Sequence, residues 1–173
     1  AMAPGELNAF GEKQVRTLLT GIGGFAGSHL ADYLLAQTNW QIVGCVLSEC
    51  DIPTHLADRV TCYAVDLRDL DAVRKAAQGV DMIFHLGALI SIPYSYLHPI
   101  EVVETNVQGT LNVLIAARDL AVERVIHTST SEVYGSAMRV PINEDHPLQG
   151  QSPYSASKIG ADKIAESFYC AYS

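Results

Sequence analysis

Short apolar runs alternate along the chain with longer segments whose apolar residues recur at the three- and four-residue spacing of a helix. The short runs favour strands at residues 15–19, 41–47, 60–64, 81–86 and 124–127. The longer segments favour helices at residues 24–36, 69–78, 100–120 and 152–172. Strands that alternate with helices are typical of βαβ units, so the pattern predicts an α/β fold with a doubly wound parallel sheet between two helical layers.

Two segments stand outside this pattern. Residues 1–14 precede the first strand and are expected to form a flexible tail, which leaves residues 15–173 as one domain. Residues 135–152 form one long irregular stretch that contains Pro147 and Gly150. Because this stretch exceeds the length of an ordinary connection, we expect it to have a functional role.

Composition excludes several classes of function. The 173 residues contain 11 lysines and arginines against 19 acids, a formal net charge of −8, without a basic run that would bind nucleic acid or anionic membranes. No apolar stretch reaches the roughly 20 residues of a membrane span, and the N-terminus lacks a secretory core. We therefore expect a cytoplasmic protein with neither nucleic acid nor membrane as a partner.

Cysteine and histidine spacing predicts no metal site. The four cysteines form no CxxC pair and two of them lie in predicted strands, so buried free thiols are expected rather than disulfides or zinc ligands. The six histidines form neither an HExxH motif nor an i,i+4 pair. The cysteines are Cys45, Cys50, Cys62 and Cys170.

A glycine-rich turn follows the first predicted strand and opens the first predicted helix. Gly21, Gly24 and Gly27 permit, in turn, a tight bend, close approach of the backbone to a pyrophosphate, and close packing of helix on strand. Free N–H groups at the helix start would bind the phosphates, although an ordinary glycine-rich turn gives the same pattern. No acid ends the second strand, where Glu49 comes slightly late, so the choice between NAD and NADP stays open.

Asp66 follows the third strand, where its carboxylate would accept a hydrogen bond from an adenine amino group or, alternatively, cap the next helix. Tyr154 and Lys158 lie four residues apart on one predicted helix, so both side chains share a face. A nearby cation favours the phenolate form of a tyrosine, which makes this pair a candidate base. Thr130 and Glu132 follow the fifth strand, at the edge where such sheets bind ligands, although both residue types also occur there without function.

Together these motifs resemble the extended short-chain dehydrogenase/reductase superfamily, in its nucleotide-sugar epimerase and dehydratase branch. The matching pieces occur in order as TGIGGFAGSHL, VDLRD, IFHLGAL, ETNVQGTLNVLIAAR, TSTSEVYG and SPYSASK. The resemblance implies a Rossmann-like fold that binds NAD, or NADP, with adenine beside Asp66 and Leu67. The other implied cofactor-binding residues are Gly21, Gly24, Phe25, Ala26, Gly27, Leu86, Gly87, Ala88, Thr105, Tyr154 and Lys158. Gly87 replaces the family's usual alanine, which we expect to loosen this wall slightly.

The same resemblance implies catalytic roles. Tyr154 takes a proton from a sugar hydroxyl as hydride passes to the nicotinamide, Lys158 tunes the phenol and binds ribose, and Thr130 orients the reacting oxygen. Glu132 is similar to the base of sugar 4,6-dehydratases, which remove the C5 proton, release water from C6 and return the hydride to C6. Ser131 replaces the aspartate of the deoxythymidine-diphosphoglucose dehydratases, so the acid for the leaving hydroxyl stays unidentified.

Residues 88–99 and 143–169 resemble dehydratases of legionaminic-acid-type pathways, and the TSE sequence also resembles the GDP-mannose dehydratase type. A 4-epimerase, a uronate decarboxylase and a noncatalytic dinucleotide-binding module remain alternatives. The family's members are nearly twice as long and contain a C-terminal portion that binds most of the sugar nucleotide. The chain is thus predicted to be the cofactor-binding and catalytic half of such an enzyme. The family also implies a homodimer formed by the helices at 100–120 and 152–172, which otherwise would pack only on their own sheet.

Overall fold

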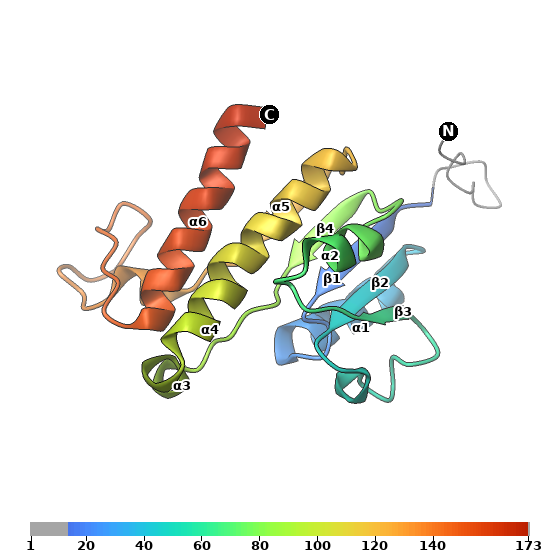
Figure 1. Ribbon diagram of the computed structural model, residues 1–173, viewed down its shortest axis with the longest axis horizontal. Coiled ribbons are helices and arrows are strands. Elements are labelled where there is room, and N and C mark those ends of the chain that lie inside the picture. Colours follow the sequence, from blue (N-terminus) through green and yellow to red (C-terminus); the bar gives the residue numbers. More distant parts are fainter. Residues whose placement is uncertain (1–13, 173) are drawn as a thin grey trace.

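A five-stranded parallel sheet lies at the centre of the molecule, as seen in a computed structural model that describes residues 14–172 (Figure 1). The strands are β1 (Arg16–Thr20), β2 (Gln41–Val46), β3 (Thr61–Ala64), β4 (Met82–His85) and β5 (Arg124–His127). Their order is β3-β2-β1-β4-β5, so the chain crosses back over β1 after β3. This crossover places the carboxyl ends of β1 and β4 beside the crevice where open α/β sheets bind ligands. The predicted α/β class is confirmed.

Helices cover both faces of this sheet and extend beyond its β5 edge. They are α1 (Phe25–Gln37), α2 (Leu70–Ala76), α3 (Ile92–Leu97), α4 (Pro99–Val103), α5 (Gly109–Asp119) and α6 (Pro153–Tyr172). A π-helical segment, η2 (Glu104–Gln108), joins α4 to α5, while the 3₁₀ turns η1 (Glu49–Asp51) and η3 (Ser131–Tyr134) follow β2 and β5. Figure 1 shows α4 and α5 as one rod with α6 beside it, and α6 packs on both.

Side chains on β1 point alternately into two buried cores, as the two-residue period of a strand requires. Leu18 packs in a cluster with α2 and α5, and Leu19 packs on the opposite face with α1. The first cluster also contains Val73, Ala76, Val113, Ala116 and Ala117, and the second contains Ala31 and Leu34. The central strands are therefore buried on both faces, whereas β5 at the edge alternates between exposed and half-buried residues.

The observed strands agree with the predicted ones to within one residue at either end. The helix expected over 100–120 is instead divided by η2, and α3 was not predicted. Pro93 lies in the first turn of α3, where a helix tolerates proline, and the Ser91 hydroxyl caps this turn by accepting from the Tyr94 N–H at 3.3 Å. Residues 135–152 contain no helix or strand, as predicted. The expected flexible tail lies outside the described residues except for Gln14.

All four cysteines are free, but the expectation that they are buried is wrong for two of them. Cys50 is exposed because it lies in η1, and Cys170 is exposed near the end of α6. Burial raises the pKa of Cys45 to about 12. Within residues 14–172, no group of three His, Cys, Asp or Glu side chains is placed to bind a metal, and no helix is both long and apolar enough to cross a membrane.

Candidate cofactor and active site

Two glycines in the turn between β1 and α1 occupy places that a side chain would not fit. Gly21 has a φ of +70°, and a Cβ atom there would lie 2.8 Å from the Cα atom of Gly87. A Cβ atom at Gly27 would lie 2.3 Å from the carbonyl oxygen of Gly21. Only glycine therefore permits α1 to start this close to the end of β1.

The start of α1 is open to solvent. Gly24 is its N-cap residue and provides no side chain, and Phe25 and Ala26 are exposed. An α-helix leaves the N–H groups of its first turn, here those of Phe25, Ala26 and Gly27, without intrahelical acceptors. Together with the helix dipole, these groups favour an anion at this position. The turn thus fits a pyrophosphate without the help of a lysine.

The segment after β2 lies against the same turn. A Cβ atom at Gly23 would lie 2.4 Å from the Asp51 carbonyl oxygen, and the Ser48 N–H donates to the Asp51 carboxylate at 3.1 Å. Asp51 thus caps η1, and the Glu49 side chain is exposed. Residues 47–52 contain two acids, Glu49 and Asp51, and neither a lysine nor an arginine. This strand tip provides no cation for a 2′-phosphate.

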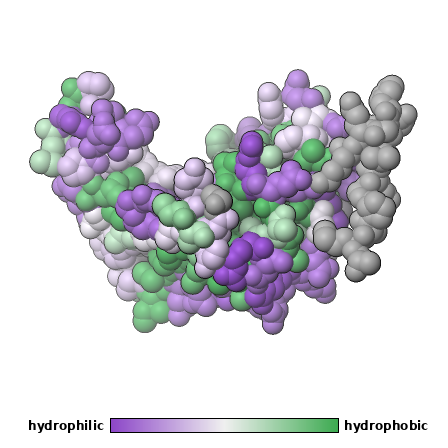
Figure 2. All heavy atoms as spheres, turned by 90° about the horizontal axis from the view of Figure 1, so that it is seen from above, coloured by the Kyte–Doolittle hydropathy of each residue, from purple (hydrophilic) through white to green (hydrophobic). Residues whose placement is uncertain are grey.

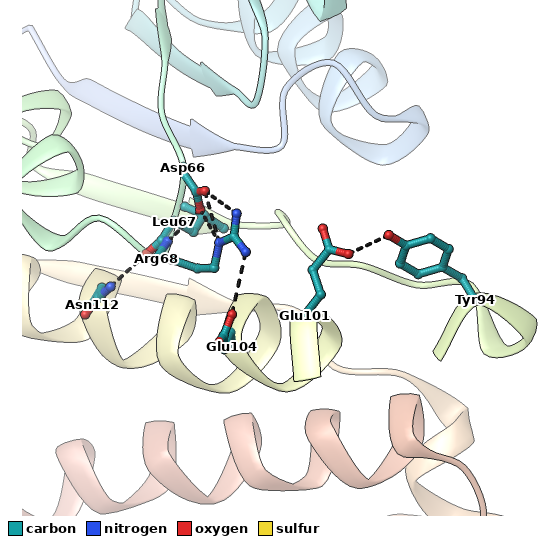
Figure 3. Close-up of polar contacts among 7 residues, drawn as sticks. All are labelled: Asp66, Leu67, Arg68, Tyr94, Glu101, Glu104 and Asn112. Atoms are coloured by element: carbon teal, nitrogen blue, oxygen red, sulfur yellow. Dashed lines mark hydrogen bonds and ion pairs between the residues drawn. The ribbon is translucent and has the colours of Figure 1, made fainter. Parts of the chain in front are cut away.

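Asp66 and Arg68 form a close ion pair after β3 (Figure 3). The Arg68 guanidinium donates to both Asp66 carboxylate oxygens, at 2.6 to 3.0 Å, and approaches Glu104 of η2 at 3.6 Å. Hydrogen bonding from Arg68 lowers the pKa of Asp66 below its ordinary value. Figure 3 also shows a separate contact in which the Tyr94 hydroxyl donates to Glu101 at 2.5 Å. The alternative role for Asp66 as a helix cap is wrong, because Asp69 caps α2.

Leu67 fills the space left by two glycines. Its Cδ1 atom would lie 2.9 Å from a Cβ atom at Gly87, and its Cβ atom would lie 2.9 Å from one at Gly109. The Asn112 side chain donates to the Leu67 carbonyl at 2.8 Å, which anchors the segment to α5 (Figure 3). The expected loosening at Gly87 is therefore wrong, because the Leu67 side chain occupies the place of the missing methyl group.

His85, at the end of β4, connects β1 with α5 through a buried chain of hydrogen bonds. Its Nδ1 atom lies 2.8 Å from Thr20 Oγ1, and its Nε2 atom lies 2.9 Å from Thr110 Oγ1. Thr110 donates its own proton to the Asn106 carbonyl at 2.6 Å, so His85 is neutral with its proton on Nε2. Burial, with smaller effects from His127 and Lys158, lowers the pKa of His85 to about 3.

The first turns of α6 place Tyr154 and Lys158 on a buried face. Both residues are 6% exposed, and Pro153 occupies the first position of the helix. The Lys158 ammonium donates to the Thr128 carbonyl, just beyond β5, at 2.8 Å. Burial lowers the pKa of Lys158 below its ordinary value, and the charge of Asp162 opposes this shift. The predicted pair thus shares a face, and its cation is anchored to the end of β5.

Thr130 and Glu132 lie at the start of η3, against which α6 packs. The Thr130 hydroxyl caps this turn by accepting from the Glu132 N–H at 3.3 Å, and the Glu132 side chain is exposed. The glutamate is therefore available to a bound molecule as well as to solvent. Residues 135–152 then lead back to α6, and Gln149 joins the two ends of this loop by donating to the Tyr134 carbonyl at 3.2 Å.

The sequence reading missed Asn106, which is 1% exposed within η2. Its amide accepts from the Leu89 N–H at 2.8 Å and donates to the Leu89 carbonyl at 2.9 Å and to Ser157 Oγ at 3.0 Å. Ser157 in turn donates to the Tyr154 carbonyl at 2.7 Å. Asn106 thus ties the segment after β4 to the helix that contains Tyr154. A polar residue in an otherwise amphipathic helix was the available signal, and π-helical turns often occur at functional sites.

The structure brings the predicted site residues to the carboxyl edge of the sheet. Each of β1, β3, β4 and β5 ends one to three residues before a predicted segment, and Thr105 lies in η2. The four segments are 21–27, 66–67, 86–88 and 130–132. Figure 2 shows that the surface is hollowed between the end of the molecule with β1–β3 and the end with residues 135–152. The individual binding and catalytic roles stay predictions.

Comparison with known proteins identifies both epimerases and dehydratases among the relatives. The UDP-glucose 4-epimerase of Streptomyces lividans is 33% identical over 153 residues, which cover 85% of this chain and 45% of that protein. The dTDP-glucose 4,6-dehydratase DesIV of Streptomyces venezuelae, solved with NAD and TYD bound, is 34% identical with a TM-score of 0.83. The UDP-glucose 4-epimerase of Thermotoga maritima, solved with UDP-glucose, is 25% identical with a TM-score of 0.85. The structural matches each cover 91% of this chain and 52% of the other.

The chain thus spans about half the length of the relatives that it matches. These relatives share one fold but catalyse different reactions. The comparison therefore identifies the family of this chain but not its reaction. The family described as GDP-mannose 4,6 dehydratase matches residues 18–173, which include all the motifs of the site. The chain belongs to this family of nucleotide-sugar dehydratases and epimerases.

Proposed function

We propose that this chain is the cofactor-binding and catalytic part of an NAD-dependent nucleotide-sugar 4,6-dehydratase. The observation that carries the proposal is the buried pair of Tyr154 and Lys158 on α6, which packs against the turn that begins after Thr130 and includes Glu132. The similarity to DesIV supports a dehydratase, since that protein is a dTDP-glucose 4,6-dehydratase of the same fold.

The residues present fit NAD. The glycine turn leaves room and free N–H groups for the pyrophosphate, and Asp66 and Leu67 would bind the adenine. The tip of β2 lacks a cation for a 2′-phosphate, which favours NAD over NADP. Leu86, Gly87, Ala88 and Thr105 would line the remaining wall. Bound NAD would supply a hydride acceptor that later returns the hydride, so no net oxidation of the sugar results.

The chain's own residues would handle the protons. The Tyr154 hydroxyl would take a proton from the sugar hydroxyl, and the Lys158 ammonium would favour the phenolate that does so. The Thr128 carbonyl restrains Lys158 and leaves the ammonium two further donors for a ribose. Thr130 would orient the reacting oxygen, and the exposed Glu132 would remove the C5 proton.

A 4-epimerase is the second candidate reaction, because the Streptomyces lividans and Thermotoga maritima relatives are UDP-glucose 4-epimerases. An epimerase needs Tyr154 and Lys158 but does not need a carboxylate base at position 132. The exposed Glu132 therefore favours the dehydratase. In either reaction the substrate would be a nucleotide-diphospho-sugar, and we propose a cytoplasmic homodimer, which light scattering of the chain would test.

Two measurements test the proposal. Titration of the 173-residue chain with NADH and NADPH, followed by nicotinamide fluorescence, should give tighter binding of NADH. Absence of NADH binding at millimolar concentration would contradict the cofactor assignment. Turnover is tested on an intact protein that joins this chain to the family's C-terminal portion, because that portion is expected to bind most of the sugar nucleotide. Incubation of that protein with UDP-N-acetylglucosamine, GDP-mannose or dTDP-glucose should yield a 4-keto-6-deoxy sugar.

The Glu132→Gln variant should lose this product and still bind NADH, whereas Glu144→Gln, an exposed acid in the loop 135–152, should keep both. Undiminished product from Glu132→Gln would contradict the role of the glutamate. A product epimeric at C4 would identify an epimerase. NADH binding without turnover of any nucleotide sugar would identify a noncatalytic binding module.

A further inference from the structure

The carboxylate of Asp162 lies one helical turn beyond Lys158 on α6 and receives two hydrogen bonds from the end of β5. His127 Nε2 lies 2.8 Å from Asp162 Oδ1, and the Ser129 hydroxyl donates to Asp162 Oδ2 at 2.5 Å. The side chains of His127 and Asp162 are only 11% and 24% exposed. Each carboxylate oxygen thus binds a different residue of the same short segment.

Residues 127 and 129 flank Thr128, whose carbonyl accepts the hydrogen bond from Lys158. The Asp162 carboxylate therefore fixes the backbone on both sides of the one carbonyl that anchors the catalytic cation. In the described part of the chain, Lys158 and Asp162 make no direct hydrogen bond to each other. They are connected through residues 127–129, to which both side chains are hydrogen-bonded. Thr130 and η3 follow directly, so the same restraint reaches the next predicted catalytic residue.

Charge adds to this geometry. Burial has the largest single effect on the pKa of Asp162 and raises it, but the hydrogen bonds from His127 and Ser129, together with the charges of His127 and Lys158, leave that pKa below its ordinary value. Asp162 is thus an anion that partly offsets the effect of burial on Lys158. The other titratable groups around Lys158 are Tyr154 on α6, His127 on β5 and His85 on β4, and His85 is neutral near pH 7.

The His127 ring contains a buried nitrogen whose presence does not stabilise the fold. Its Nδ1 atom is buried without a hydrogen-bond partner among the described residues, and the His85 ring lies at a centroid distance of 5.6 Å. A buried polar atom without a partner costs free energy, so an apolar side chain at this position would satisfy packing better. What His127 provides instead is an N–H donor directed at Asp162.

We infer that Asp162 is a positioning residue that, through His127 and Ser129, fixes the Thr128 carbonyl and with it the Lys158 ammonium. The inference rests on the proposed function only in treating Lys158 as a catalytic group. The clamp itself, defined as Asp162 with His127 and Ser129, is a property of this chain that is measurable without cofactor or substrate.

The test is a ¹³C NMR titration of the 173-residue chain with its lysines labelled at Cε. The chain has four lysines, and Lys158→Arg identifies the signal of interest by its loss. In Asp162→Asn the pH midpoint at which the Lys158 ammonium loses its proton should fall, because the neighbouring anion is gone. The NMR relaxation of Lys158 Cε should report greater motion of the side chain, because the clamp is lost. The matched control, Glu166→Gln, removes one exposed charge from the same helix and should change neither quantity.

Ser129→Ala removes one hydrogen bond of the clamp and leaves the charge of Asp162 in place, so it distinguishes the effect of the clamp from that of the charge. It also tests the inference if Asp162→Asn does not fold. It keeps the anion, so the Lys158 midpoint should stay constant while the motion of Cε increases. Ser167→Ala, which removes a local hydroxyl contact on α6, is its control. Asp162→Glu keeps the negative charge on a longer side chain. Its Lys158 midpoint should therefore equal that of the unaltered chain, whereas the motion of Lys158 Cε should be greater.

An unchanged midpoint in Asp162→Asn, or unchanged Lys158 motion in Ser129→Ala, would overturn the inference. Titration of the same samples with NADH keeps this result separate from the proposed function. If Lys158 responds as expected and NADH does not bind, the clamp stands and the proposed function fails. If NADH binds and Lys158 does not respond, the clamp fails and the cofactor assignment stands.

Discussion

The two ends of the sheet's ligand edge are built by different physical means. On the side of β1 and β2, the backbone is positioned by excluded volume: Gly21 and Gly27 allow contacts that no side chain would permit, and both strands are buried on both faces. On the side of β5, an edge strand that pairs with β4, the segment 127–129 is positioned by hydrogen bonds with α6, whose residues lie more than 25 residues away in sequence.

The difference indicates how each region will fail. On the side of β1 and β2, which we call the cofactor side, Gly21 and Gly27 leave no space for a side chain, so small-to-large changes at these positions should be the most damaging. The side of β5 and α6, which we call the catalytic side, has few apolar contacts to lose. Removal of a polar partner there should alter the geometry of the site more than the stability of the fold.

The Gly27→Ala variant should lose about 3 kcal/mol of unfolding free energy, because its Cβ atom would lie 2.3 Å from the Gly21 carbonyl. Gly24→Ala is the control. Its Cβ atom would lie 3.3 Å from the same oxygen, at a φ of −77°, and should cost less than about 1 kcal/mol. Urea unfolding followed by circular dichroism measures both. Equal losses would mean that excluded volume does not determine this turn.

His85 should make the stability depend on pH in acid. Its pKa of about 3, against an ordinary value of 6.5, means that the unfolded chain binds a proton between these values and the folded chain does not. Stability present above pH 6.5 should therefore fall as the pH drops toward 3, by about 1.4 kcal/mol per pH unit, or roughly 2 kcal/mol at pH 5.

The His85→Gln variant keeps a hydrogen-bonding side chain without this titration, so its stability should decline less steeply between pH 6.5 and 5. Urea unfolding of both proteins at several pH values gives the difference in slope, and contributions from the other groups cancel. Parallel curves for the two proteins would mean that His85 is protonated in the folded state as easily as in the unfolded one.

The Gly87→Ala variant tests excluded volume at a position that departs from the family's alanine. The new methyl group would lie 2.9 Å from Leu67 Cδ1 and 3.2 Å from Thr20 Oγ1, and should cost about 1 to 2 kcal/mol. Leu67→Val removes the obstructing methyl and alone should cost about 1 kcal/mol. The double variant should cost less than the sum, by at least about 0.5 kcal/mol. Strict additivity in urea unfolding would show that the two residues do not compete for one space.

Much of the cofactor side could be predicted from the sequence because its determinants are local. Strands β1 to β4 and the glycine turn follow from hydrophobic period and from where glycine is required. The error at Gly87 arose because its neighbour in space, Leu67, lies twenty residues away in the chain. No local pattern reports which side chain fills a gap.

The catalytic side could be predicted only in part. The i,i+4 spacing placed Tyr154 and Lys158 on one face, but it did not indicate the Thr128 carbonyl, Asp162 or Asn106 as their supports. These contacts join segments that lie 30 to 51 residues apart in the sequence. A polar residue on a helix is also far more often solvated than buried, so its sequence position alone is a weak signal.

The pair of Asp66 and Arg68 is a polar anchor on the side otherwise built by excluded volume, and it gives the smallest predicted effect. Both side chains are 37% exposed, so solvent screens the pair. If Arg68 holds the Asp66 carboxylate toward the adenine amino group, the chain should bind NAD more tightly than nicotinamide hypoxanthine dinucleotide, which has a carbonyl in place of that amino group. Arg68→Gln should reduce this preference by roughly threefold, which corresponds to less than 1 kcal/mol.

Arg74→Gln provides the control, because Arg74 is 38% exposed and pairs with Asp119 at 2.6 Å, away from the proposed site. It should leave the preference unchanged. Fluorescence competition against NADH measures both variants on the 173-residue chain. If Arg68→Gln keeps the full preference, Asp66 does not depend on its partner, and the cofactor side is then positioned by packing alone.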